Sequence, residues 1–149
     1  MQVSESFIRD VVMPEIEATG GATVSVSPYG MPPALLRMDK YQPPTWVVGV
    51  GVEPIYVSPV LRESVEAIAS SANFILDTFD LNAWSALGFW VDDDGMLVIE
   101  PVETYTSHIM ALVRASERGQ QAVYALHSGQ VEYLAPARGA GALVPNADR

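Results

Sequence analysis

The chain has 149 residues, of which 49% are hydrophobic and 17% charged, and it has no cysteine. This composition is typical of a folded globular protein, and it excludes disulfides, thiolate metal sites and cysteine nucleophiles. Eighteen acidic residues against eight basic residues give a net charge of −10. Because nucleic acids and anionic membranes are bound through clustered Lys and Arg, we expect no direct binding to either.

The first residues predict a helix followed by a strand. Apolar residues recur at helical spacing over 7–16, and Ser4 or Ser6 can cap the helix. Pro14 is expected to kink or split this helix, and a Gly-Gly pair ends it. Alternating β-branched residues over 22–27 predict a strand with one solvent-facing side.

The middle of the chain predicts a long loop, two strands and the longest helix. Five Pro and one Gly within 28–44 favour a loop, because neither a helix nor a central strand tolerates that density. Residues 46–50 and 55–57 predict two strands with a turn at 51–54. The helix is expected to open at a Ser-Pro pair and to cover 58–79.

The last third predicts two hairpins with a helix between them. An Asp-Asp-Asp-Gly turn at 92–95 joins apolar runs, which is the strongest short-range hairpin signal. Thr106 or Ser107 is expected to cap the helix, and a second hairpin is expected over 122–134. The helix is predicted to carry four residues on one face, namely Ile109, Leu112, Val113 and Ser116.

Together these elements predict an α+β fold. We expect a mixed or mainly antiparallel sheet of about seven short strands built from hairpins, with three helices packed on it. The length favours one domain over residues 1–135, and the Pro-, Gly- and Ala-rich residues 136–149 are interpreted as a tail, flexible or ordered by a partner.

Three titratable residues lie close together in sequence and could carry proton-transfer chemistry. Glu100 and Glu103 flank Pro101, and His108 follows five residues later. The same residues could equally be charge at the start of a helix, where the dipole favours anions. The three aspartates of the turn at 92–95 do not match a calcium loop, and no glycine-rich dinucleotide loop is present, so no metal and no cofactor are expected.

The proline-rich loop is unusually apolar for a surface connection. Exposed aromatic and methionine side chains on a loop are typical of interfaces, although they could also fold back onto the core. The candidate partner-binding residues are Tyr29, Met31, Leu35, Leu36, Met38, Tyr41 and Trp46.

The last third of the chain resembles small proteins of actinobacteria and their phages that have no established activity. The resemblance rests on the Leu-Gly-Phe-Trp-Val-Asp hairpin at 87–92, the helix after it and the Gly-Gln-Gln-Ala-Val-Tyr-Ala-Leu run at 119–126. These are turn and core-strand motifs, so the resemblance implies a source and not a mechanism.

The sequence therefore favours a non-enzymatic, acidic interaction protein, consistent with a phage-encoded origin. We expect it to bind a host protein, or to self-associate as a homodimer, through the apolar loop at 28–46. The N-terminus lacks the basic and apolar regions of a signal peptide, so a cytoplasmic location is expected. Two alternatives stay open: a small enzyme that uses Glu100, Glu103 and His108, and an acidic inhibitor or DNA mimic that binds a basic nucleic-acid-binding protein.

Overall fold

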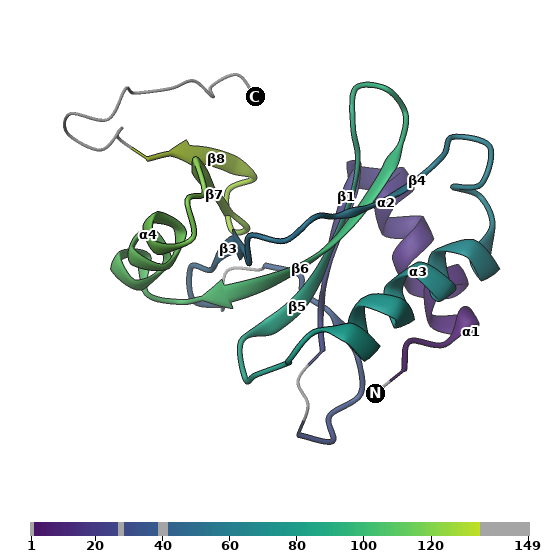
Figure 1. Cartoon of the computed structure of the whole chain (residues 1–149), viewed down its shortest axis with the longest axis horizontal. Helices are drawn as coiled ribbons and strands as arrows, with labels where there is room; N and C mark the ends of the chain where they lie inside the picture. Colours follow the sequence, from purple (N-terminus) through teal and green to yellow (C-terminus); the bar gives the residue numbers. More distant parts are fainter. Residues whose placement is uncertain (1, 27–28, 39–41, 135–149) are drawn as a thin grey trace. The chain divides into compact units, whose positions relative to one another are not determined.

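The computed structural model describes residues 2–26, 29–38 and 42–134 (Figure 1). The chain divides into two compact units, each described here by itself. Unit 1 comprises Met1–Arg37 and Val52–Glu103, and unit 2 comprises Met38–Gly51 and Thr104–Arg149. The expectation of one domain over 1–135 stays a prediction, and the tail at 136–149 lies outside the described residues.

The N-terminal helical segment of unit 1 has three parts. These are α1 (Glu5–Phe7), the π-helix η1 (Ile8–Val12) and α2 (Met13–Thr19). Ser4 caps the start, because its Oγ accepts a hydrogen bond from the Phe7 N–H at 3.0 Å. The proline at position 14 has no N–H to donate, and its ring would clash with the carbonyl four residues earlier, so the widened π turn just before it relieves that conflict. The helix type changes from π to α between Val12 and Met13, but the backbone dihedral angles stay helical there, so the expected split takes the form of a π segment and not of a break.

Gly20 ends α2 in the left-handed conformation, with φ of 89°. Its N–H donates to the Ile16 carbonyl at 2.7 Å. Glycine reaches this conformation without the Cβ clash that other residues meet, which is why the helix stops here and β1 begins at once.

Unit 1 holds an antiparallel sheet. Its strands are β1 (Gly21–Ser25), β2 (Ala34–Leu35), β4 (Ile55–Val57), β5 (Ser85–Val91) and β6 (Leu97–Tyr105), whose last two residues belong to unit 2. The order is β2-β1-β5-β6, with β4 also paired to β6. The α+β class and the antiparallel character of the sheet are confirmed.

Three expectations for unit 1 need correction. The loop at 28–44 contains the short strand β2, which pairs with β1. The helix α3 covers Val65–Thr78 and does not begin at the Ser-Pro pair, because residues 58–64 form separate turns and Ser64 Oγ caps the helix at the Ala67 N–H. The predicted strands at 46–50 and 55–57 do not pair with each other: the first is β3 (Trp46–Gly49) and pairs with β7 (Ala122–Ala125), whereas the second is β4 and pairs with β6.

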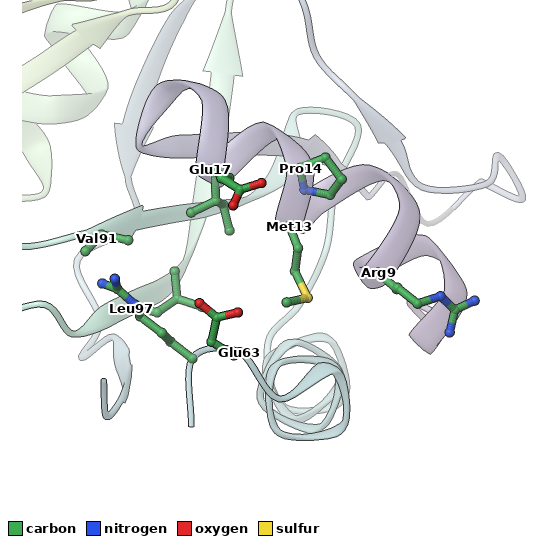
Figure 2. Close-up of a pocket in the computed structure, with 9 residues that line it drawn as sticks. Arg9, Met13, Pro14, Glu17, Glu63, Val91 and Leu97 are labelled. Carbon is green, nitrogen blue, oxygen red and sulfur yellow. The ribbon is translucent and has the colours of Figure 1, made fainter. Parts of the chain in front are cut away.

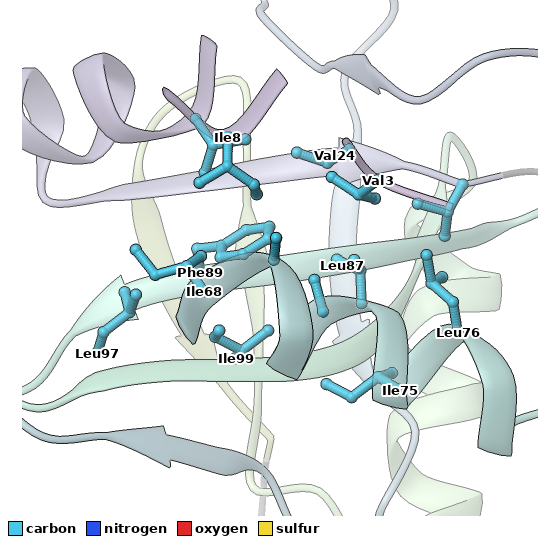
Figure 3. Packing of buried hydrophobic residues seen from close by; sticks show 14 of the residues in the cluster. Val3, Ile8, Val24, Ile68, Ile75, Leu76, Leu87, Phe89, Leu97 and Ile99 are labelled. Atoms are coloured by element: carbon cyan, nitrogen blue, oxygen red, sulfur yellow. The ribbon is translucent and has the colours of Figure 1, made fainter. Parts of the chain in front are cut away.

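The core of unit 1 lies between the helices and one face of the sheet (Figure 3). Phe89 and Ile99 lie opposite each other on neighbouring strands and are 2% and 0% exposed. Ile68 and Ile75 of α3 and Ile8 of η1 pack on this face from the helical side. Burying side chains of this size contributes about 1.5–3 kcal/mol each, so this cluster is the main stabilising feature of unit 1.

Unit 2 is a small helix-on-sheet unit. It contains β3 (Trp46–Gly49), α4 (His108–Glu117), β7 (Ala122–Ala125) and β8 (Gln130–Tyr133), with strand order β3-β7-β8. Ser107 Oγ caps α4 at the Met110 N–H, and the predicted second hairpin is confirmed. A Cβ at Gly49 would lie 2.7 Å from Gln120 Oε1, so this approach is too close for a larger residue without a shift of the glutamine side chain.

The face that α4 presents to its sheet differs from the predicted one. Ala111 and Ala115 are fully buried and pack with Val48 and Val123. The predicted face is wrong for Ile109, Val113 and Ser116, which are exposed, while Leu112 packs on the cluster. The reason is the size of the side chains. The contact between α4 and the sheet is filled by alanine methyl groups, whereas the hydrophobic pattern in the sequence favours a face made of the larger apolar residues.

Candidate functional site

The candidate loop residues do not form one set in the structure. Tyr29 and Met31 are 71% and 64% exposed in unit 1. Leu35 belongs to β2 and packs against the core of unit 1, whereas Trp46 packs in the cluster of unit 2. Leu36 and Met38 are half-buried, and Tyr41 lies outside the described residues. Tyr29 and Met31 therefore remain as candidate contact residues.

The two histidines of the chain gather around Trp46 in unit 2. The ring of His108 stacks on Trp46 with centroids 4.7 Å apart, and His127 meets Trp46 edge-on at 4.9 Å. His108 Nε2 lies 2.7 Å from Glu132 Oε1. His127 Nδ1 lies 3.1 Å from the Thr45 backbone nitrogen and 3.2 Å from the Thr45 carbonyl oxygen. These contacts assign both imidazoles a packing and positioning role within unit 2.

The proposed acid–base group is not assembled. Register along β6 places Glu100 and Glu103 on opposite faces, because side chains alternate and the two differ by three positions. Glu103 is 7% exposed and accepts a hydrogen bond from Asn82 Nδ2 at 2.7 Å. His108 belongs to unit 2 and contacts Glu132. Glu100 and Glu103 therefore do not converge in one cleft, which a shared acid–base site would require.

Glu100 is nevertheless an unusual carboxyl. It points to the sheet face opposite the main core, on the same side of β6 as the buried Val98 and Val102. Burial raises the pKa of Glu100 to about 7, because desolvation disfavours the charged form. Because of this raised pKa, the free energy of unfolding is expected to depend on pH between about 4.5 and 7.

The aspartates of the β5–β6 turn are mainly structural. Asp92 Oδ1 accepts hydrogen bonds from the N–H groups of Asp94 and Met96 at 2.9 and 3.0 Å, which closes the turn. Among the described residues, no group of three or more His, Asp or Glu side chains is placed to hold a metal ion.

An open cavity of about 510 Å³ in unit 1 lies beside the π-helix (Figure 2). Figure 2 shows Met13 and Glu17 on its helical side and Glu63 and Leu97 across from them. The lining includes two arginines, Arg9 and Arg62, and two glutamates. Because these charges balance, the cavity offers no selection for a ligand of either sign.

Charge is divided very unequally between the two units. Unit 1 carries fourteen acidic and three basic residues, a net charge of −11, whereas unit 2 carries four acidic and five basic residues, a net charge of +1. Arg9 pairs with Asp10 at 3.2 Å, Arg37 pairs with Glu15 at 3.3 Å, and Arg62 donates to the Gly95 carbonyl. Three arginines cannot neutralise fourteen carboxyl groups, so unit 1 presents a strongly negative surface.

Some of this charge lines an open groove of about 500 Å³ in unit 1. The groove lies between the N-terminal segment and α3, and carboxylates reach it from Glu5, Glu66 and Asp77. Phe74 lines the same groove and is 59% exposed. The arrangement combines three carboxylates with an accessible aromatic ring.

The floor of this acidic groove is fixed by Asn73 of α3. Its Oδ1 accepts a hydrogen bond from the Val3 N–H at 2.7 Å, and its Nδ2 donates to the Val3 carbonyl at 3.0 Å. Val3 is 2% exposed, so the N-terminal segment is held by both hydrogen bonds and burial. Sequence reasoning missed this site, because the only local signal is one asparagine within an otherwise ordinary helix.

Comparison with protein-family models, with curated proteins and with solved structures gave no match. In the part of the chain that the structure describes, no helix has both the length and the apolar character needed to cross a bilayer.

Proposed function

We propose that this protein is a non-enzymatic, acidic interaction protein that binds a basic protein through the groove of unit 1. The observation that carries the proposal is the excess of fourteen acidic over three basic residues in unit 1, with three of those acids lining a groove beside an exposed aromatic ring. Surface charge of this kind steers a basic partner and favours specificity.

The groove has the chemistry to receive several Lys or Arg side chains along its length, because Glu66 and Asp77 are eleven residues, roughly 16 Å, apart on α3. Carboxylates from Glu5, Glu66 and Asp77 can accept charge-assisted hydrogen bonds, and the ring of Phe74 can contact the cation by its face. Because the Asn73–Val3 hydrogen bonds already hold the N-terminal segment on α3, little ordering is needed on binding.

The nature of the partner follows from charge. A basic nucleic-acid-binding protein is one such partner. The alternative of an acidic inhibitor or DNA mimic is therefore a special case of this proposal. Tyr29 and Met31 of the same unit supply exposed apolar surface for the partner as well. The enzyme alternative has less support, because Glu100 and Glu103 face opposite sides of the sheet.

The proposal is tested by affinity capture with the full chain as bait. A groove variant that combines Glu5→Gln, Glu66→Gln and Asp77→Asn is compared with the wild type. We expect capture of a basic protein by the wild type and a loss of its affinity by at least about tenfold in the variant, since each charged contact contributes about 1 kcal/mol or more.

The matched control removes the same number of charges from exposed positions of unit 1 away from the groove lining: Glu53→Gln, Asp93→Asn and Asp94→Asn. This control should keep the affinity within about threefold of the wild type, because distant surface charges are screened by salt. Equal losses in the two triple variants, or a captured partner that is acidic, contradict the proposal.

A further inference from the structure

The β7–β8 hairpin of unit 2 carries apolar side chains on its outer face. Tyr124, Val131 and Tyr133 are 38%, 52% and 76% exposed. Tyr124 lies directly opposite Val131 in the register, and Tyr133 lies two residues further along the same face. The inner face is already used, since Val123 packs in the cluster with α4. The hairpin therefore has apolar side chains on both of its faces.

β8 is also an edge strand. Among the described residues it has one strand neighbour, β7. The Leu134 N–H donates to the Gln121 carbonyl at 2.8 Å, which fixes the phase of the ladder. In an antiparallel ladder alternate residues bond to the same neighbour, so Gln130 and Glu132 bond toward β7, while the N–H and C=O groups of Val131 and Tyr133 point to the open side. Such an edge is a template for another strand.

Net charge favours unit 2 over unit 1 as the contact surface between two copies of the chain. Two copies that met through unit 1 would each bring a net charge of −11, whereas two copies that met through unit 2 would each bring +1. Like charges disfavour the first contact and barely affect the second. A second copy is therefore compatible with the edge of unit 2 and not with the surface of unit 1.

We propose that β8 pairs antiparallel with β8 of a second copy, about a two-fold axis at Val131, to form a homodimer. In this register the two Val131 residues exchange N–H···O=C bonds across the axis. A two-fold axis perpendicular to the sheet keeps the outer faces on one side, so both copies contribute Tyr124, Val131 and Tyr133 to one apolar strip.

The side chains of the inner face select this register. With Val131 on the axis, Gln130 lies opposite Glu132 of the partner subunit, and an amide can donate to a carboxylate. A shift that centres the axis on Glu132 would place two carboxylates directly opposite each other, which is destabilising. The dimer depends on unit 2 alone and is independent of the acidic groove.

The test uses the size of the full chain in solution and two lysine variants. The wild type is expected to be a dimer by light scattering at micromolar concentration. Val131→Lys places a charge in the apolar strip and is expected to weaken the dimer at least about tenfold. Ile109→Lys changes a residue of α4 in the same unit that is 74% exposed and should leave the dimer intact.

The chain has no cysteine, so single-cysteine variants report the register directly. Val131→Cys residues would face each other at about 5.5 Å between Cα atoms, within the range for a disulfide. Tyr133→Cys residues would be offset by four positions, roughly 13 Å along the strand. We expect Val131→Cys to crosslink under mild oxidation at least tenfold faster than Tyr133→Cys.

Three results would overturn the proposal. A monomeric wild type would show that another segment or another protein covers β8. Equal dimerisation of the two lysine variants would place the interface elsewhere, and crosslinking of Tyr133→Cys as fast as that of Val131→Cys would exclude pairing about Val131.

Discussion

The two units of this chain differ in the size of the side chains that they bury and in their net charge. Unit 1 packs large side chains between its helices and sheet and carries fourteen of the eighteen acidic residues. Unit 2 packs Ala111 and Ala115 of its helix against the sheet and leaves Tyr124, Tyr133, Val131 and Ile109 exposed. The excess of negative charge and the larger buried side chains thus belong to unit 1, whereas exposed apolar side chains occur in both units.

The largest effect is expected in the core of unit 1. Phe89→Ala should lower the free energy of unfolding by about 3–5 kcal/mol, because it leaves a cavity among fully buried residues. Val123→Ala in unit 2 removes two methyl groups and should lower it by about 2 kcal/mol. Denaturant titration followed by circular dichroism measures both. Equal losses of unfolding free energy would mean that the two cores contribute equally to stability.

The second prediction concerns Glu100 and pH. Its folded-state pKa of about 7 lies above the ordinary value of 4.5, so the folded state retains a proton that the unfolded state releases. Stability should therefore fall as pH rises from about 4.5 to 7 and then level off. Glu100→Gln should remove this dependence and raise the free energy of unfolding at pH 8 by about 1–3 kcal/mol.

The control for this pH experiment is Glu53→Gln, an exposed glutamate of the same unit. It should leave the wild-type pH profile unchanged. A Glu100→Gln variant whose unfolding free energy still falls between pH 5 and 7 would contradict the assignment of the effect to this carboxyl.

The third prediction tests the floor of the groove. Asn73→Ala removes both hydrogen bonds to Val3 and leaves a buried backbone N–H and C=O without them, so it should lower stability by about 2 kcal/mol. Hydrogen exchange should also increase at the first residues of the chain. Ser70→Ala, on the same groove lining, is the control and should change neither measurement.

The smallest effects are expected at the helix caps, which compare the units most directly. Ser64→Ala removes the cap of α3, and Ser107→Ala removes the cap of α4. Each should lower stability by about 1 kcal/mol. Hydrogen exchange should show faster opening within the unit that holds the changed cap, and faster opening spread evenly over both units would mean that they unfold together.

Local signals predicted much of this fold. Ser4, Pro14 and Gly20 each act on a neighbour within five residues, and the sequence alone indicated the cap, the split and the end of the first helix. The Asp-Gly turn at 94–95 likewise predicted the β5–β6 hairpin, because the Asp92 carboxylate and the left-handed glycine close it locally.

Features that depend on distant partners were not predictable in this way. The partners of β3 and β4 lie far along the chain, so the turn between the two strands falsely indicated a hairpin. The ring contacts of His108 and His127 with Trp46 also join residues that are separated by more than sixty and eighty positions in the sequence. The sequence indicates Glu100 as a candidate for proton transfer, but the raised pKa of this carboxyl comes from burial, which no local sequence pattern reveals.

The central claim is that the acidic groove of unit 1 is the binding surface. Its most direct measurement is the dissociation constant of the captured partner for the wild type and the groove variant as salt is raised. The claim predicts that wild-type affinity falls steeply with salt and that the Glu5, Glu66 and Asp77 substitutions remove most of this dependence. An affinity that is insensitive to salt, or a salt dependence that survives these substitutions, would contradict it.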